Sequence, residues 1–293
     1  MSKKVRFATA FAILAAALYA INIPFSKELL SFAEPTMMAA FLYLGAGLGL
    51  FIFGGIQKLL SPGETARPLS KKELPFTLLM VLLDIAAPIL LMFGIKYSSA
   101  SNVSLINNFE IVATSLIALF IFKEKISKKL WFAIGLVTLA SIILSFEKKG
   151  MLEFNLGSLC VLGACLCWGL ENNCTRQLSD KSAVEIVVIK GTFSGLGSLI
   201  VALIIGESLP TVSRVFVILL LGFVSYGLSI LFYIKAQSVL GAAKTSAFYS
   251  VAPFLGVLFA MTIFGEAPAV QFYFALAIMI AATVIMIRDT INS

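Results

Sequence analysis

Histidine is absent from this 293-residue sequence, and charged residues are scarce. Without histidine the chain lacks the commonest metal ligand and general base, which excludes histidine-dependent triads and zinc-hydrolase chemistry. Charged residues make up 13% of the chain and hydrophobic residues 60%, whereas soluble domains have about 25% charged and roughly 45–50% apolar residues. So few charged side chains cannot cover so much apolar surface, and the composition argues against a water-soluble fold.

The four cysteines have no metal-binding spacing, because all of them fall within one apolar segment. Cys160, Cys167 and Cys174 recur every seven residues and are expected to form a stripe of small packing side chains on a helix. Glycine-rich phosphate loops, nucleophile elbows and nucleotide motifs are missing from the sequence. We therefore expect no cofactor, no metal and no direct use of ATP.

Long apolar runs dominate what is present. A membrane span needs about 20 mainly apolar residues, and alternating ten-residue segments typical of outer-membrane barrels are absent, so the runs are predicted to be helices. The first run is too long for the apolar part of a signal peptide and is expected to remain as a span. Ten spans are predicted, at residues 7–30, 35–56, 75–96, 102–122, 130–146, 156–175, 184–206, 213–236, 242–264 and 269–287.

Lysine and arginine are distributed unevenly between the predicted spans. The formal charge is +7, but the basic residues lie in short clusters between apolar runs, which is typical of membrane proteins rather than of nucleic-acid binders. With the N-terminus in the cytoplasm, sixteen basic residues fall on the inner side and five on the outer side. The positive-inside rule therefore predicts that both termini are cytoplasmic, in a plasma or inner membrane.

Short motifs recur in the same order in the two halves of the chain. Their offset drifts slowly from about 149 to 142 residues, which indicates a duplication of residues 7–146 as residues 156–287. Five spans is an odd number, so the second copy must enter the membrane inverted, an arrangement that places transporter sites near the midplane. The matching pairs are Ser26-Lys27-Glu28-Leu29 with Thr175-Arg176-Gln177-Leu178, Ala46-Gly47-Leu48-Gly49 with Ser194-Gly195-Leu196-Gly197, and Phe122-Lys123-Glu124 with Phe264-Gly265-Glu266.

Several of these motifs resemble a known family. They are Ser104-Leu105 through Phe122-Lys123-Glu124-Lys125, Ser246-Ala247-Phe248-Tyr249 through Ala252-Pro253-Phe254 to Phe264-Gly265-Glu266, and Trp168-Gly169 with Arg176. In their order the chain resembles the drug/metabolite transporter superfamily, in its ten-span branch with two EamA-type domains. The resemblance implies a secondary carrier with a central cavity for amino acids, nucleotide-sugar-like or cationic metabolites.

The chain departs from its own repeat in the fourth span. Ile111 stands where Pro253 stands in the second copy, and the adjoining segment Asn107-Asn108-Phe109-Glu110 is unusually polar. The substrate of better-known relatives therefore cannot be transferred to this chain.

Four ionisable residues fall well inside predicted spans, where charge is costly unless it faces a partner or a cavity. Glu171 and Lys190 lie at similar depths on adjacent spans and are predicted to form an ion pair, with either a structural or a substrate-coupling role. Asp84 and Glu110 have no obvious cationic partner. Because hydrocarbon disfavours a charged carboxylate, each is a candidate to carry a proton or to neutralise a substrate ammonium group.

Polar residues also recur at helical spacing on four spans, and these stripes can converge on one polar, aromatic-lined cavity. Hydrogen bonding between helices is the alternative explanation. The stripes are Asn107, Glu110 and Thr114; Trp168, Glu171 and Thr175 with Asn172; Ser246, Tyr249, Ser250 and Pro253; and Tyr226 flanked by Ser225 and Ser229. The predicted substrate- or proton-binding set is Asp84, Asn107, Asn108, Glu110, Trp168, Glu171, Asn172, Lys190, Tyr226 and Tyr249.

Proline and glycine add local expectations. Pro24, Pro88 and Pro253 lie within spans and predict either discontinuous helices or simple kinks. The GxxxG pairs Gly45/Gly49 and Gly191/Gly195 predict close helix contact.

Together these features predict an all-α integral membrane protein with ten transmembrane helices in two inverted five-helix repeats. It is expected to be a secondary active transporter of small polar metabolites, amino-acid-like or cationic and aromatic, working by alternating access with a possible proton coupling. An intramembrane enzyme acting on lipid-linked substrates is the alternative, although no enzymatic activity is expected. The expected partners are a small-molecule substrate and the lipid bilayer, without nucleic acid, and the chain is expected to be a monomer or homodimer.

Overall fold

The computed structural model describes residues 3–60, 67–97, 106–145, 156–264 and 270–292. Within these ranges the regular structure is entirely helical, as the composition predicts. Ser104, Leu105, Gly265 and Glu266 of the family-like motifs lie outside the described residues, as does the beginning of the fourth predicted span.

Most helices coincide with predicted spans, because each apolar run is long enough to form a helix and is bounded by polar or glycine-containing segments. The helices are α1 (Lys3–Ala20), α2 (Asn22–Leu29), α3 (Pro35–Leu60), the short 3-10 helix η1 (Lys71–Glu73), α4 (Leu74–Tyr97), α6 (Phe109–Phe120), α7 (Lys128–Ser145), α8 (Leu156–Leu178), α9 (Ala183–Ile204), α10 (Val212–Gly222), the π-helix η2 (Phe223–Leu228), α11 (Ser229–Leu240), α12 (Ala242–Tyr249), α13 (Ala252–Phe264) and α14 (Val270–Asn292).

Six helical stretches in the described part are long and apolar enough to cross a membrane. They are Lys3–Ser26, Pro35–Leu59, Lys71–Tyr97, Ala183–Ile204, Val212–Leu240 and Phe272–Thr290. The protein is therefore a multi-pass membrane protein, although ten spans stay a prediction. The described part of the fourth span contains only the 12-residue helix α6, and the ninth span is divided into α12 and α13.

Three of the predicted spans contain irregular segments. The first divides at Ile21, three residues before Pro24, and the ninth divides between Tyr249 and Ala252, just before Pro253. Proline lacks an N–H group and clashes with the preceding turn, which explains breaks at these points. Pro88, in contrast, lies inside the continuous helix α4. The π-helix Phe223–Leu228 in the eighth span has no proline and was not anticipated from the sequence.

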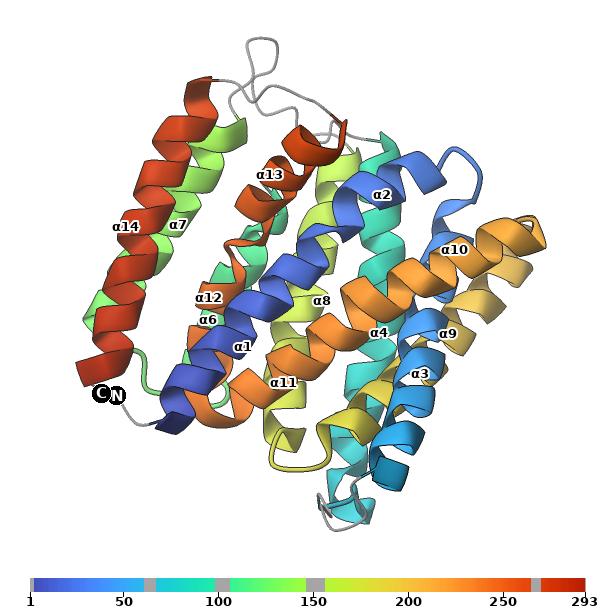
Figure 1. Ribbon diagram of the computed structural model, residues 1–293, viewed down its shortest axis with the longest axis horizontal. Coiled ribbons are helices and arrows are strands. Elements are labelled where there is room, and N and C mark those ends of the chain that lie inside the picture. Colours follow the sequence, from blue (N-terminus) through green and yellow to red (C-terminus); the bar gives the residue numbers. More distant parts are fainter. Residues whose placement is uncertain (1–2, 61–66, 98–105, 146–155, 265–269, 293) are drawn as a thin grey trace.

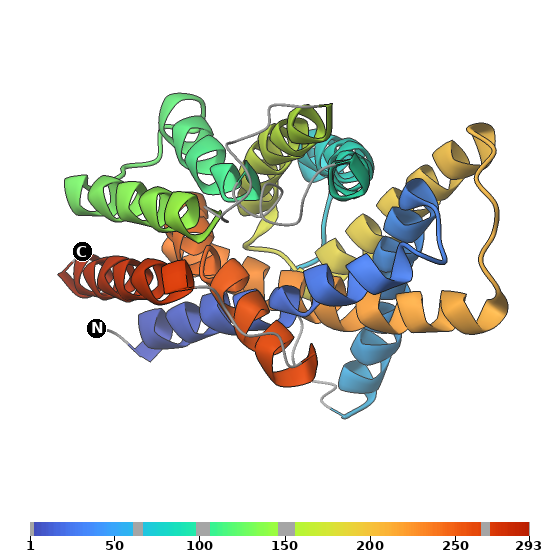
Figure 2. The same cartoon turned by 90° about the horizontal axis from the view of Figure 1, so that it is seen from above.

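The helices pack in pairs drawn from distant parts of the chain. The closest pairs are α3 with α9, α4 with α8, α7 with α14, and α1 with α11. Figure 1 shows the α7 and α14 pair at one edge of the molecule, with α3 and α9 toward the other edge. Seen from above, α1 and the α10–α11 rod run side by side across the bundle (Figure 2). The beginning of α1 and the end of α14 lie close together in both views.

Glycine permits the close approach of α3 and α9. A methyl group added at Gly191 would meet the backbone of Gly47 and the carbonyl oxygen of Tyr43, 2.8 Å away. A methyl group added at Gly195 would likewise lie 2.7 Å from Leu44. The predicted close contact is confirmed for Gly191 and Gly195. It is confirmed for Gly45 and Gly49 as well, which approach α10 and η2.

Candidate functional site

A buried ion cluster lies where α4, α8 and α9 meet. Lys190 Nζ on α9 lies 2.7 Å from Glu171 Oε1 on α8 and 3.1 Å from Asp84 Oδ2 on α4. The Tyr43 hydroxyl on α3 donates to Asp84 Oδ1 at 2.9 Å, and the Thr175 hydroxyl donates to Glu171 Oε1. The exposed fractions are 0% for Asp84, 2% for Glu171 and 4% for Lys190. Each charge is therefore removed from solvent and held by named partners, as buried charges must be.

The cluster confirms one expectation and corrects another. The predicted pair of Glu171 and Lys190 is present. The expectation that Asp84 has no cationic partner is wrong, because α4 packs against both α8 and α9 and brings Asp84 to the same ammonium group. One lysine thus neutralises carboxylates from two different helices.

Glu110, on the first turn of α6, occupies a different environment. The Asn172 side-chain amide on α8 donates to Glu110 Oε1 at 2.8 Å and also lies 3.2 Å from the Thr114 hydroxyl. No lysine or arginine of the described residues makes a salt bridge with Glu110. Among the described residues, the hydrogen bond to its carboxylate comes from the Asn172 amide.

Amide side chains fix α8 in place beside Glu110. Asn173 Nδ2 donates to the Thr114 carbonyl oxygen at 3.0 Å and to the Gly169 carbonyl oxygen at 2.8 Å. Gln237 Nε2 on α11 donates to the Asn172 carbonyl oxygen at 3.0 Å. Asn172 therefore presents its amide to Glu110 from a backbone that is tied to both α6 and α11.

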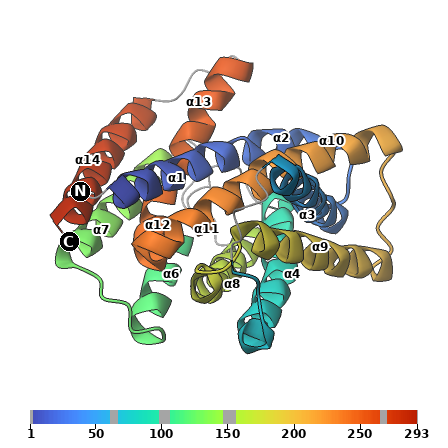
Figure 3. The same cartoon turned by 60° about the horizontal axis from the view of Figure 1, so that its bottom comes forward.

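A central cavity of about 520 Å³, counted with its open mouth, lies between the ion cluster and Glu110. Figure 3 shows α1, α8, α11 and α12 grouped around the middle of the bundle. The lining residues are Tyr19, Tyr43, Glu110, Trp168, Glu171, Asn172, Thr175, Lys190, Tyr226, Ser229, Ile230, Tyr233 and Tyr249.

Seven of the ten predicted site residues line this cavity, so the polar stripes of α6, α8, η2 and α12 meet in one place. Asp84 is not among the lining residues, because it is fully buried behind Lys190 and Tyr43. Asn107 and Asn108 line a neighbouring pocket instead.

Three lining tyrosines were missed by the sequence reasoning: Tyr19, Tyr43 and Tyr233. Tyr43 stands within an apolar run, and its clue was the tyrosine itself, because a buried phenol group in a span needs a polar neighbour. Helical spacing was a further clue for the other two, since Tyr19 is followed by Asn22 and Ser26, and Tyr233 follows Tyr226 and Ser229.

The tyrosine rings form a continuous contact network along the cavity wall. Ring centroids lie 5.0 Å apart for Tyr43 and Tyr226, 5.7 Å for Tyr226 and Tyr19, 5.4 Å for Tyr19 and Tyr249, and 5.0 Å for Tyr249 and Tyr233. Edge-to-face and tilted arrangements at these distances are favourable. The five rings come from five helical segments, so the aromatic wall is a product of the whole bundle.

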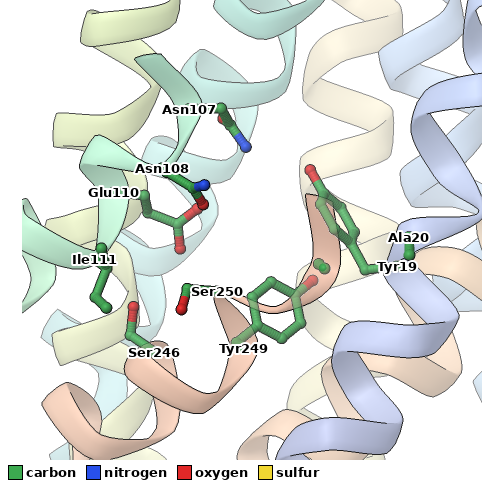
Figure 4. A pocket seen from close by; sticks show the side chains of 10 residues that line it. Tyr19, Ala20, Asn107, Asn108, Glu110, Ile111, Ser246, Tyr249 and Ser250 are labelled. Carbon is green, nitrogen blue, oxygen red and sulfur yellow. The ribbon is translucent and has the colours of Figure 1, made fainter. Parts of the chain in front are cut away.

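The neighbouring pocket has about 440 Å³ of empty space and lies beside the break between α12 and α13. Figure 4 shows Asn107, Asn108 and Glu110 on one side of it, facing Tyr19 and Tyr249 on the other. Glu110, Tyr19 and Tyr249 line both this pocket and the central cavity. These three side chains therefore form the boundary between the two spaces.

Metal ligands are not grouped in the described part of the chain, where no three cysteine, aspartate or glutamate side chains are arranged to hold an ion. The cavity lining combines carboxylates, an ammonium group, amides and aromatic faces.

Comparison with known proteins places this architecture among transporters. The model of the EamA-like transporter family matches residues 6–146 and again residues 155–288. An uncharacterized transporter of Methanothermobacter thermautotrophicus is 28% identical over 277 residues, which cover 87% of this chain and 78% of that protein. A solved crystal structure superposes with a TM-score of 0.80 over 95% of this chain and 97% of its own, at 14% identity, which shows a shared fold.

Proposed function

Because the chain belongs to the EamA-like transporter family, we propose that it is a secondary active carrier of small polar metabolites, amino-acid-like or cationic and aromatic, that works by alternating access. The family and the archaeal relative point to a transporter rather than an enzyme. The observation that carries the proposal is the central cavity, which combines charged, amide and aromatic side chains inside an apolar bundle.

Both halves of the chain contribute to this cavity. Tyr19, Tyr43 and Glu110 come from α1, α3 and α6, whereas Trp168 and Tyr249 come from α8 and α12. A ligand in this position would touch both halves at once. Relative movement of the halves would then change which side of the membrane the ligand faces.

The packing pattern supports two inverted five-span repeats, residues 7–146 and 156–287, which make ten spans in all. The family model matches the chain twice over nearly the same ranges. The counterparts in the two halves are α1 and α8, α3 and α9, α4 and α11, α6 and the α12–α13 segment, and α7 and α14. When each helix is replaced by its counterpart, the pairs α3–α9 and α7–α14 stay the same. The α4–α8 pair exchanges into α11–α1, and α6–α8 exchanges into the contacts of α1 with α12 and α13; all of these pairs pack together. Such a relation is expected of a duplicated unit.

The orientation is proposed from charge and from the ends of the chain. The beginning of α1 and the end of α14 lie together, which fits an even number of spans. The excess of lysine and arginine on that side favours the cytoplasm. We therefore place both termini in the cytoplasm and the protein in the plasma or inner membrane, as a monomer or homodimer without nucleic-acid partners.

Helix irregularities next to the cavity provide points at which the halves could move. The break at Ile21 follows Tyr19 by two residues, the break after Tyr249 begins at Ser250, and Tyr226 lies within the π-helix. Backbone that departs from the α-helix bends more readily and is frequent at functional sites. Three of the five cavity tyrosines thus stand at positions where a small change in helix direction would reshape the cavity.

Counterflow of radiolabelled solutes in proteoliposomes tests the carrier function. Ligands are first chosen by thermal stabilisation of the purified chain across amino acids, amines and nucleotides. A carrier exchanges the unmodified labelled ligand across the membrane. Recovery of a chemically changed solute would indicate the enzyme instead, and a stabilising ligand that never exchanges would overturn the carrier proposal.

Proton coupling has a separate test, because Glu110 and Asp84 are its candidate groups. Uptake is compared across pH for the parent chain and for Asp84→Asn and Glu110→Gln. If both variants keep the pH dependence of the parent, neither carboxylate couples protons to transport.

A further inference from the structure

The charges around the central cavity do not balance, because three carboxylates surround one ammonium group, and among the described residues Glu110 is the carboxylate without a salt bridge. Lys190 Nζ lies within 3.1 Å of Asp84 and 2.7 Å of Glu171, so its single positive charge is shared by two carboxylates. In the described part of the chain no second cation pairs with a cavity residue, and Glu110 has only the Asn172 amide on Oε1. With all three acids ionised, the cavity has an excess of negative charge.

Glu110 also has a free side that faces space rather than protein. Its second oxygen, Oε2, accepts no hydrogen bond from the described residues, and the side chain is half-buried rather than sealed. It lines both the central cavity and the neighbouring pocket. A ligand can therefore reach this carboxylate, whereas Asp84 is closed off by Tyr43 and Lys190.

The groups opposite Glu110 are aromatic. Tyr19 and Tyr249 line the same two spaces, with ring centroids 5.4 Å apart and planes inclined by 39°. Figure 4 shows both rings across the pocket from Glu110. The face of an aromatic ring attracts an ammonium group, most strongly where water is excluded. One carboxylate facing two tyrosine rings is an arrangement that recognises an organic cation.

We propose that Glu110 is the anchor for the positively charged nitrogen of an aromatic amine, with Tyr19 and Tyr249 against the ligand. Asp84, Lys190 and Glu171 stay paired with one another and do not take the ligand charge, although Lys190 and Glu171 also line the cavity. The proposal rests on the carrier function and narrows its substrate class. An amino acid is a poorer ligand than the corresponding amine, because its carboxylate would meet a negatively charged cavity in which Lys190 is already paired with two carboxylates.

Three probes of matched shape separate the possible charge states of the ligand: phenethylamine is a cation, phenylalanine a zwitterion and 2-phenylethanol neutral. Binding of each to the purified full-length chain is measured by calorimetry. Hydrogen bonds to charged groups are stronger than neutral ones by an amount that corresponds to about tenfold in affinity. We expect phenethylamine to bind at least about tenfold more tightly than either of the other two probes.

Variants assign the preference to Glu110. Glu110→Gln should bring phenethylamine within about threefold of 2-phenylethanol, whereas Glu110→Asp, which keeps the charge, should retain the cation preference. The matched control is Glu34→Gln, because Glu34 forms an exposed surface pair with Lys96 at 3.2 Å, away from the cavity. If Glu110→Gln fails to fold, the parent preferences and Glu110→Asp still decide the question.

Equal binding of phenethylamine and 2-phenylethanol to the parent chain would overturn the anchor. Tighter binding of phenylalanine, an unchanged preference in Glu110→Gln, or no phenethylamine binding at millimolar concentration would do the same. The carrier function fails differently. Cation-selective binding without counterflow in proteoliposomes would contradict transport and leave the anchor standing, whereas counterflow of a solute without cation preference would support transport and contradict the anchor.

Discussion

Lys190 should be essential for the stability of the helix bundle. The substitution Lys190→Met measures its contribution to the free energy of unfolding. The substitution keeps the length of the side chain but removes the ammonium group. Asp84 and Glu171 would then be two carboxylates without a cation, at 0% and 2% exposure. Removing one partner of a buried ion pair costs about 3–5 kcal/mol, because the remaining charge is left unpaired in a poorly polarisable interior.

The corresponding fall in melting temperature follows from the size of the chain. In domains of about 150–250 residues, 1 kcal/mol shifts the midpoint by about 2–4 °C, so Lys190→Met should melt about 6–20 °C below the parent. Unfolding in detergent is expected to be irreversible, and apparent midpoints are therefore compared at one heating rate. The fraction that stays monodisperse after heating gives this midpoint by size-exclusion chromatography.

Two comparisons show whether the loss comes from the buried charges. Lys96→Met makes the same chemical change in an ion pair whose side chains are 44% and 48% exposed, and it should cost about 0–1 kcal/mol. Neutralising both acids by adding Asp84→Asn and Glu171→Gln to Lys190→Met should recover most of the lost stability. A midpoint within about 2 °C of the parent for Lys190→Met, or no recovery in the triple variant, would refute this account of the cluster.

Three smaller changes test helix packing, capping and the support of Asp84. Gly191→Ala should destabilise the protein by about 1–3 kcal/mol, because its methyl group would meet the α3 backbone. The control Gly135→Ala, with nothing within 4 Å of the added methyl group, should be neutral or stabilising by about 0.5–1 kcal/mol. Equal melting temperatures of the two variants would contradict the close contact. The Glu207 carboxylate accepts hydrogen bonds from two backbone N–H groups in the first turn of α3, at 3.1 and 2.7 Å. Glu207→Ala should therefore lower stability by about 0.5–2 kcal/mol and speed amide hydrogen exchange in that turn. Unchanged hydrogen exchange would show that Glu207 does not cap α3. Tyr43→Phe should cost about 1–3 kcal/mol by leaving Asp84 without its hydroxyl donor, and a melting temperature equal to the parent would show that the donor is dispensable.

Hydropathy and helical spacing alone determine much of this protein. A long apolar run must satisfy its backbone hydrogen bonds internally, so the helical class follows from composition without knowledge of the contacts. The pairing of Glu171 with Lys190 is also readable, because adjacent spans joined by a short loop bring residues of similar depth together. The close contact at Gly191 and Gly195 follows from the absence of side chains there.

Other features were decided only by the tertiary structure. Asp84 shares Lys190 because α4, far away in the chain, packs against α9, and no local pattern encodes that neighbour. Tyr19 and Tyr43 reach the cavity for the same reason, since helices distant in the chain pack around them. Depth along a helix can be counted from the sequence, but the rotation of one helix against another is set by packing between distant segments. That rotation determines which carboxylate is neutralised and which remains open to a ligand.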